Sequence, residues 1–483
     1  MNTTPSPGDL LGHPKGLFLL FGTEMWERFS YYGMRAFLVF YLTAKTMDGG
    51  MGWTTSEAIS LYGTFTMLVY ITPLLGGWLA DNVLGQRRSI IIGGLLMAAG
   101  QFTLGTPHEF VVGMEETFMY IGLGLLIAGN GLFKPNISTM VGDLYKDGDH
   151  RRDGAYTIFY MGINLGAAFA PLIVGTIAET YAWQYGFVAA GIGMIISVIM
   201  QLTLGDKYLG NIGVVPAAKR PGAIMTNADG TPVALTKEEF DRIKVIFIMG
   251  VFTIVFWAGF EQAGGLMNLY AKDFTDRDVM GFEVPATWFQ SVNAIFIVIF
   301  APIIASIWIK MGDNEPNSPI KFALGLVFLA VGFVFMIGAA MQQGGDVTVK
   351  TSMIWLILAY LFHTLGELCL SPIGLSMVTK LAPLRLASLM MGIWFGFTAL
   401  ANKVAGFVGQ FIGEGEEQVN NAMSIFAGIA ITAVISAIIM YFISGTLVRW
   451  MHGAEGPSHK PTEEEKLDEE IAVTADHEGI APR

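Results

Sequence analysis

The sequence predicts an all-α membrane protein with twelve transmembrane helices in two six-helix bundles. Its 483 residues are 53% hydrophobic and only 14% charged, which is far from the composition of a soluble globular chain. Apolar runs of about 20 residues, the length that a helix needs to cross a bilayer, recur along nearly the whole chain. Runs such as residues 294–309 are apolar on every side, whereas the strands of a membrane barrel would alternate in polarity.

The expected transmembrane helices form two sets of six on either side of a polar segment. In chain order they cover residues 17–45, 55–83, 88–106, 116–142, 153–180, 183–204, 240–271, 285–311, 319–341, 351–382, 386–412 and 421–451. The N-terminal bundle thus covers residues 17–204 and the C-terminal bundle residues 240–451, joined by a cytoplasmic linker at 205–239. Residues 1–16 precede the first bundle, and the acidic segment 452–483 has the composition of a disordered tail.

The distribution of Lys and Arg sets the expected orientation. An even number of spans places both termini on one side of the membrane. If that side is the cytoplasm, 20 of the 28 basic residues fall in inner segments and four in outer segments. The other four, Arg28, Arg35, Lys134 and Lys403, fall within spans. Both termini are therefore expected in the cytoplasm.

The first span carries an unusual run of ionisable residues, TEMWERFSYYGMR. At about 100° per residue, Arg28, Tyr31 and Arg35 lie within roughly 60° of one another on the helix face of Glu24. Glu24 and Arg28 form an acid–base pair at i, i+4 in the favourable order. Because Glu27 lies at the edge of the same face, this span is expected to present one polar side to the protein interior.

Later spans contain further charges within apolar surroundings. Lys134, Glu261 and Glu367 each stand alone in their own helix, and an ionisable residue at the bilayer centre costs about 2.5–3.5 kcal/mol. We therefore expect these three to face one cavity together with Arg28 and Arg35, although static pairs between helices are an alternative. Neutral polar and aromatic residues join them at helical spacing: Tyr70, Asn164, Trp257, Asn293, Ser371 and Trp394.

The two halves share short motifs. MGINLGA in the fifth span matches MGIWFGF in the eleventh, which makes Asn164 and Trp394 equivalent, and Pro135 in the fourth span matches Pro372 in the tenth. Parallel six-helix repeats are the architecture of major-facilitator transporters, whose substrate site lies between the halves near the midplane. No nucleotide-binding motif occurs, so any uphill transport would be driven by an ion gradient.

The short loop after the second span, GGWLADNVLGQRR, points the same way. Its spacing of Gly77, Asp81, Gly85, Arg87 and Arg88 resembles a loop of the major facilitator superfamily. Glycines permit a tight turn, while the acid and the arginines can tie helix ends together. An ordinary positive-inside loop is the alternative, and either interpretation gives a conformational rather than a catalytic role.

A longer set of motifs resembles one family of that superfamily. Glu24, Glu27, Arg28, Phe29, Tyr31 and Tyr32 reproduce the pattern E-x-x-E-R-F-x-Y-Y. FYMGINLGA, FEQ and GELCLSPIGLS, which begin at residues 159, 260 and 366, match later motifs. From about residue 13 to 450 the chain is similar to the bacterial proton-dependent oligopeptide transporters (the POT or PTR family). The resemblance implies symport of di- and tripeptides with protons by alternating access.

The resemblance also implies a substrate site. Arg28, Arg35 and Lys134 would receive the peptide carboxylate, while Glu367, with Asn164 and Asn293, would hold its amino group. Aromatic residues would wall the side-chain pockets: Tyr31, Tyr32, Tyr70, Trp257 and Trp394. Glu261 and Ser371 complete the implied set. The chemistry fits independently, because a zwitterionic peptide needs one cationic and one anionic anchor.

Proton coupling is implied for Glu24, Glu27, Arg28 and Glu261. Two pairs, Arg35 with Glu261 and Lys134 with Glu367, would be salt bridges that form and break between states. The histidine that some members carry in the second span is absent, so proton coupling is expected to depend on carboxylates. Glu27 and Glu261 are the leading candidates. The linker is too short and polar for the two extra helices of many bacterial relatives.

Two other functions stay open at this point. A transporter of the same fold could carry nitrate or an amino-acid-derived metabolite, although Glu367 would disfavour a lone anion. A peptide receptor would need an output module, and an enzyme would need a nucleophile with its base or a metal cluster. We expect no cofactor beyond the coupling proton, no metal and no nucleic-acid partner. We also expect a monomer as the functional unit. The short loop at 342–350 predicts a multi-pass protein of a bacterial inner membrane.

Overall fold

Helices dominate the structure, a computed structural model that describes residues 9–146, 149, 151–216, 235–383 and 386–454. Residues 1–8, part of the predicted linker (217–234) and the predicted acidic tail from residue 455 lie outside the described residues. In chain order the α-helices are α1 (Lys15–Thr43), α2 (Thr55–Leu79), α3 (Gln86–Leu104), α4 (Glu115–Asp143), α5 (Arg151–Ala170), α6 (Thr176–Thr180), α7 (Trp183–Leu209), α8 (Lys237–Phe260), α9 (Leu266–Asp273), α10 (Phe289–Met311), α11 (Ser318–Gln343), α12 (Met353–Leu381), α13 (Ala387–Gly409) and α14 (Glu416–Trp450).

Short elements extend or connect these helices. The 3-10 turns are η1 (Thr46–Asp48), η3 (His108–Phe110), η6 (Glu261–Ala263), η7 (Ala286–Trp288), η8 (Gly312–Asn314) and η10 (Gln410–Ile412). The π-helical turns are η2 (Ala80–Leu84) and η4 (Pro171–Gly175). In the loops, β1 (Thr275–Asp276) pairs in parallel with β4 (Thr351–Ser352), and β2 (Asp278–Val279) pairs antiparallel with β3 (Phe282–Glu283). The sequence does not predict these two-residue strands, so all-α describes the long segments only.

Ten helical segments of the described chain are long and apolar enough to cross a membrane, as expected of a multi-pass membrane protein. They are Thr55–Leu84, Glu115–Asp143, Gly154–Thr180, Trp183–Leu209, Lys237–Asp273, Ala286–Met311, Ser318–Gln343, Met353–Leu381, Leu389–Ile412 and Glu416–Trp450. Two further long helices, α1 and α3, are not in this set. Charged residues interrupt α1, and Arg87 and Arg88 open α3.

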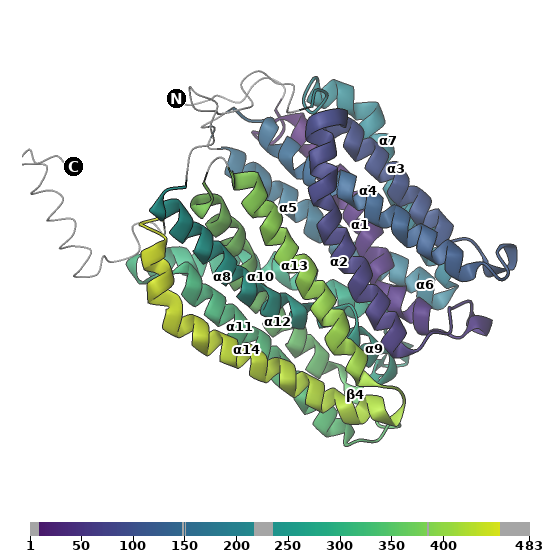
Figure 1. Cartoon of the computed structure of the whole chain (residues 1–483). Helices are drawn as coiled ribbons and strands as arrows, with labels where there is room; N and C mark the ends of the chain where they lie inside the picture. Colours follow the sequence, from purple (N-terminus) through teal and green to yellow (C-terminus); the bar gives the residue numbers. More distant parts are fainter. Residues whose placement is uncertain (1–8, 147–148, 150, 217–234, 384–385, 455–483) are drawn as a thin grey trace, which may run out of the picture.

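The helices form two groups that lie side by side (Figure 1). In the first group α1 packs against α5 and α7, and α4 packs against α2 and α3; in the second, α11 packs against α12 and α14. The groups meet where α2 packs against α13 and α5 against α10. We call the face that holds the start of α1 and the end of α14 the terminus face, and the other end the opposite face (Figure 1).

Two predicted spans are not continuous α-helices. The span expected at 240–271 is broken between α8 and α9 at Glu261–Ala263, followed by Gly264 and Gly265. A Cβ atom on Gly264 would overlap the Tyr62 hydroxyl, so a larger residue there would have to displace the Tyr62 side chain. The span expected at 153–180 contains a π-turn that begins at Pro171, because proline cannot donate a helical hydrogen bond.

The predicted loop motif ties α3 to the end of α7. Gly85 has φ +79°, which favours glycine, and Arg87 follows it. The Arg87 guanidinium donates to Asp206 Oδ1 at 2.7 Å and to the Gly210 carbonyl at 2.9 Å. Its backbone N–H donates to the carbonyl of Gly213. These contacts lie within the first group of helices.

Close packing of α3 against α4 depends on glycine. A Cβ atom on Gly129 would lie 2.5 Å from the Gly93 carbonyl oxygen and 2.8 Å from the Met97 nitrogen. Gly124, on the same helix, faces open space. Small residues of this kind let membrane helices approach backbone to backbone.

We predict that Gly129→Ala lowers thermal stability and that Gly124→Ala does not. The added methyl group at Gly129 must push the two backbones apart, and overpacking costs about 1–3 kcal/mol. The melting temperature (Tm) of the purified protein in detergent, followed by tryptophan fluorescence, measures the effect. Equal Tm values for the two variants would show that this crossing is not tightly packed.

Candidate functional site

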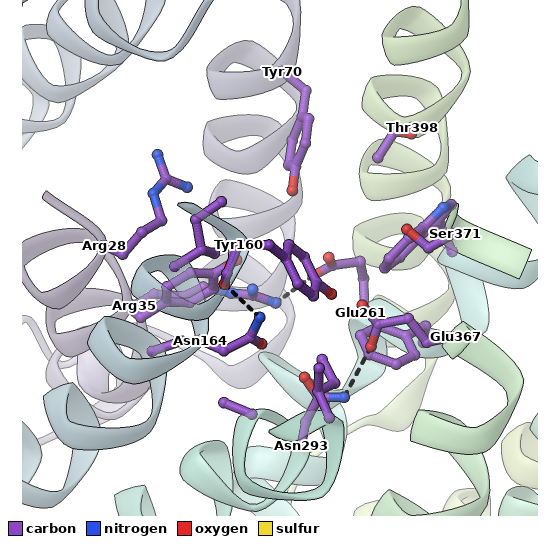
Figure 2. Close-up of a pocket in the computed structure, with 18 of the residues that line it drawn as sticks. Arg28, Arg35, Tyr70, Tyr160, Asn164, Glu261, Asn293, Glu367, Ser371 and Thr398 are labelled. Atoms are coloured by element: carbon purple, nitrogen blue, oxygen red, sulfur yellow. Dashed lines mark hydrogen bonds and ion pairs between the residues drawn. The ribbon is translucent and has the colours of Figure 1, made fainter. Parts of the chain in front are cut away.

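A cavity of about 270 Å³ lies between the two groups of helices and is lined by side chains from both. Figure 2 shows Arg28, Arg35, Tyr70 and Asn164 on one side and Glu261 and Glu367 on the other. Every residue predicted for the substrate site lines this cavity, with the exception of Tyr31: Arg28, Tyr32, Arg35, Tyr70, Lys134, Asn164, Trp257, Glu261, Asn293, Glu367, Ser371 and Trp394.

Tyr31 lies behind the cavity wall. Its side chain is buried, its ring stacks on Phe65 at 6.4 Å between centroids, and it meets the ring of Tyr32 edge-on at 5.3 Å. Tyr32, one residue later, lines the cavity. In this conformation Tyr31 therefore supports the wall through Tyr32 instead of forming part of it.

Arg28 is held by two carboxylates of its own helix. Its Nε lies 3.1 Å from Glu24 Oε1 and also donates to Glu27. Glu27 is fully buried outside the cavity lining and accepts a second hydrogen bond from Asn130 Nδ2 at 3.2 Å. Among the described residues, Arg28 Nη2 and Glu24 Oε2 make no hydrogen bond. One donor and one acceptor at this end of the site are thus unused.

Arg35 links the two groups of helices. It pairs with Glu261 and donates from Nε to the Tyr62 hydroxyl. Its side chain is 12% exposed and that of Glu261 is 4% exposed. The break between α8 and α9 places Glu261 at the end of a helix, where its side chain reaches α1. The predicted pair is formed in this conformation.

Lys134 and Glu367, the second predicted pair, have other partners. Lys134 Nζ lies 4.0 Å from the centroid of the Tyr70 ring, a cation–π arrangement. Glu367 accepts a hydrogen bond from Asn293 Nδ2 at 2.9 Å, and Asn293 also donates to Thr364. Within the described residues no salt bridge joins Lys134 to Glu367, so this pair is open in the present conformation.

The charges divide unequally across the cavity. Its three cations, Arg28, Arg35 and Lys134, come from α1 and α4 in the first group, which also contributes the carboxylate of Glu24. Glu261 and Glu367 come from the second group (Figure 2). A ligand with a negative and a positive end would therefore contact both groups at once.

Several lining residues were missed by the sequence analysis. They include Tyr160, Gln290, Tyr360 and Thr398. Helical spacing could have found all four, since Thr398 also follows Trp394 by four residues. Tyr160 precedes Asn164 by four residues, Gln290 precedes Asn293 by three and Tyr360 precedes Glu367 by seven, so each shares a face with a predicted residue.

A helical membrane protein with a charged, two-sided cavity between its halves has the architecture of a secondary transporter. The family comparison is specific. Residues 87–211 and 222–425 match the profile described as PTR2: POT family, and the chain belongs to the POT family. The resemblance seen in the sequence motifs is thereby confirmed.

Individual relatives agree with this assignment. The chain is 37% identical to the uncharacterized transporter YclF of Bacillus subtilis, over 94% of this chain and 98% of the relative. It is 36% identical to the peptide transporter YePEPT of Yersinia enterocolitica subsp. palearctica, with the same coverage. A crystal structure of a mutant peptide transporter POT in complex with alafosfalin is 36% identical, with a TM-score of 0.84 over 93% of this chain and 98% of that one.

We predict that Arg35 and Glu261 are energetically coupled. Removal of either partner leaves a buried charge without its counterion, so the losses of stability from Arg35→Gln and Glu261→Gln should not add in the double variant. In detergent, the Tm decrease of the double variant should be smaller than the sum of the single decreases by about 2–4 °C.

The pair Arg277–Glu283 provides a matched control. These side chains lie 2.8 Å apart in one loop, and that of Glu283 is 73% exposed. Exposed pairs contribute little, so this second cycle should be additive. Additivity in the Arg35–Glu261 cycle would contradict the prediction.

Proposed function

We propose that the protein is a proton-coupled symporter that imports di- and tripeptides by alternating access. It would be a multi-pass protein of a bacterial inner membrane, with twelve spans, both termini in the cytoplasm and a monomer as the functional unit. Here α1 and α3 would supply the two spans beyond the ten apolar segments. The observation that supports this most is the cavity, with cations from one half facing carboxylates from the other.

A short peptide matches this arrangement. Its carboxylate would be received by Arg28, Arg35 and Lys134, of which Arg28 keeps an unused donor. Its amino group would bind Glu367, which Asn293 already orients by a hydrogen bond. The volume of about 270 Å³ suits a small ligand. Because the anchors are the two ends of the peptide, side chains can vary.

The alternative cargoes differ in the charges that they offer. Nitrate would place an anion in the cavity opposite the carboxylate of Glu367, to which no salt bridge is made within the described residues. A metabolite derived from an amino acid carries both charges and stays the closer alternative, to be separated by competition. The Yersinia relative is named a peptide transporter, which supports peptides.

Charge balance supports a role for one proton. Four carboxylates, those of Glu24, Glu27, Glu261 and Glu367, lie in or against the cavity with three cations. One proton would neutralise this buried set, and a zwitterionic peptide would leave the balance unchanged. Protonation of Glu27 or Glu261 would release Arg28 or Arg35 from its acidic partner, so that the freed guanidinium binds the peptide carboxylate.

Dialanine uptake into proteoliposomes tests the proposal. With an inward proton gradient we expect accumulation above the external concentration, and without the gradient we expect only equilibration. A tripeptide should compete, whereas free alanine, nitrate and N-acetyl-dialanine should not, because each lacks one of the two anchors at peptide spacing. Absence of dialanine flux in folded protein, or full competition by nitrate, would overturn the assignment of the cargo.

We predict that Glu27→Gln abolishes gradient-driven accumulation of dialanine but leaves part of the counterflow exchange. Glutamine keeps a hydrogen-bond acceptor for Arg28 and Asn130, yet it cannot take up the coupling proton. Glu57→Gln is the matched control, since Glu57 completes a capping box at the exposed start of α2 and glutamine can do the same. Full accumulation by the Glu27 variant would remove Glu27 from the coupling scheme.

A further inference from the structure

Two helix crossings close the opposite face between the two groups of helices. At one, Gly175 of η4 packs so closely on Thr287 of η7 that a Cβ atom would overlap its side chain. At the other, Gly63 of α2 faces Gly406 of α13, and a Cβ atom on Gly63 would lie 2.7 Å from the Gly406 Cα. If the fifth and eleventh predicted spans are repeats, and the second and eighth likewise, the two crossings are equivalent.

A carboxylate caps a helix N-terminus across the first crossing. Glu179, near the end of α6, accepts hydrogen bonds from the backbone N–H of Ala286 at 3.1 Å and of Thr287 at 2.8 Å. It also accepts from the Thr287 hydroxyl at 2.6 Å. These donors open the helical segment Ala286–Met311 of the other group. A negative charge at this position satisfies unpaired N–H groups and complements the helix dipole.

At the second crossing a carboxylate also caps a helix N-terminus, but here the carboxylate belongs to the second group and the helix to the first. Glu414, which follows η10 in the second group, accepts a hydrogen bond at 2.9 Å from the backbone N–H of Thr55. Thr55 is the first residue of α2 in the first group. Glu414 is exposed, whereas Glu179 is half-buried and has three donors. The Glu179 cap is therefore the stronger of the two.

We infer that Glu179 and Glu414 are a pair of latches, one at each of the two crossings, that hold the opposite face closed. This inference rests on the proposed alternating-access function, in which that face must open to admit substrate. Opening separates each carboxylate from the helix that it caps and leaves the N–H groups of that helix end without their partner. The two latches thereby favour the closed state, beside other contacts between the groups such as the Arg35–Glu261 pair and the hydrogen bond from Trp288 Nε1 to Thr176.

The first measurement is a pair of inter-spin distances in the full-length protein. Nitroxide labels at Met47 and Val279, both exposed in loops of the opposite face, report its opening. Labels at Val83 and Ile309, exposed on the terminus face, report the reciprocal closure. The native Cys369 is buried and is replaced by alanine in every labelled variant to keep labelling specific.

We expect Glu179→Gln to raise the ratio of open to closed populations on the opposite face about tenfold. The exposed Glu414→Gln should raise it about twofold, and the double variant by about the product of the two. Distances on the terminus face should shorten in step. The matched control is Glu283→Gln, on the same face, because Glu283 pairs with Arg277 of its own loop and should leave both distributions unchanged.

Thr287→Val is a second, milder variant, since it removes only the hydroxyl donor to Glu179. It should raise the ratio of open to closed populations by a smaller factor than Glu179→Gln. If Glu179→Gln does not fold, Thr287→Val provides the test of the Glu179 latch. Unchanged distances in both variants, or an equal shift in the Glu283 control, would overturn the inference.

Dialanine uptake by the same variants separates this inference from the proposed function. A distance shift in a protein that fails to transport dialanine would support the latches and refute the cargo. Wild-type-like distances in variants that accumulate dialanine would support the cargo and refute the latches.

Discussion

The charges buried among apolar helices are the constraint on which the rest of the structure depends. Each costs about 2.5–3.5 kcal/mol at the bilayer centre unless a partner or water compensates it. Arg28 is compensated within its own helix by Glu24 and Glu27, whereas Arg35 finds Glu261 only across the cavity. The first cluster is thus independent of how the two groups of helices are placed, and the second pair depends on it. Any movement of the groups that separates α1 from Glu261 would therefore leave Arg35 without this counterion.

Substrate binding can drive such a movement because the cavity is electrically two-sided. In the proposed mechanism, a zwitterion whose carboxylate contacts Arg35 would replace Glu261 as the counterion, while its amino group would give Glu367 a counterion. A ligand shifts a conformational equilibrium only by its different affinity for the two states. A ligand that contacts both walls has different affinities for the two states, because the distance between the walls changes when the groups move. A lone anion would contact the basic wall only and would bias the equilibrium less.

The sequence predicted what a single helix determines. The spacing of Glu24 and Arg28 placed them on one face, and the structure joins them at 3.1 Å. Rotation of one helix against its neighbours is not contained in that spacing, so Tyr31 was expected in the wall and lies behind it. The break at Glu261 was missed, although Gly264 and Gly265 follow it, because apolar residues resume at Leu266. Glu179 was missed because its partners are backbone N–H groups of a distant helix, which no side-chain pattern reveals.

The modest strength of such backbone caps suits a protein that must visit two states. Both states are populated usefully only when they differ by a few kcal/mol, and a ligand can shift the balance only within that range. A large apolar seal on the opposite face would exceed it. At the crossings seen here, Gly63 lies against the backbone of Gly406 and Gly175 against the side chain of Thr287, and the carboxylates of Glu179 and Glu414 add directional hydrogen bonds. Water can replace those hydrogen bonds once the helices separate, so opening costs little free energy. The hydrogen bonds therefore fix the geometry of the closed face without preventing it from opening.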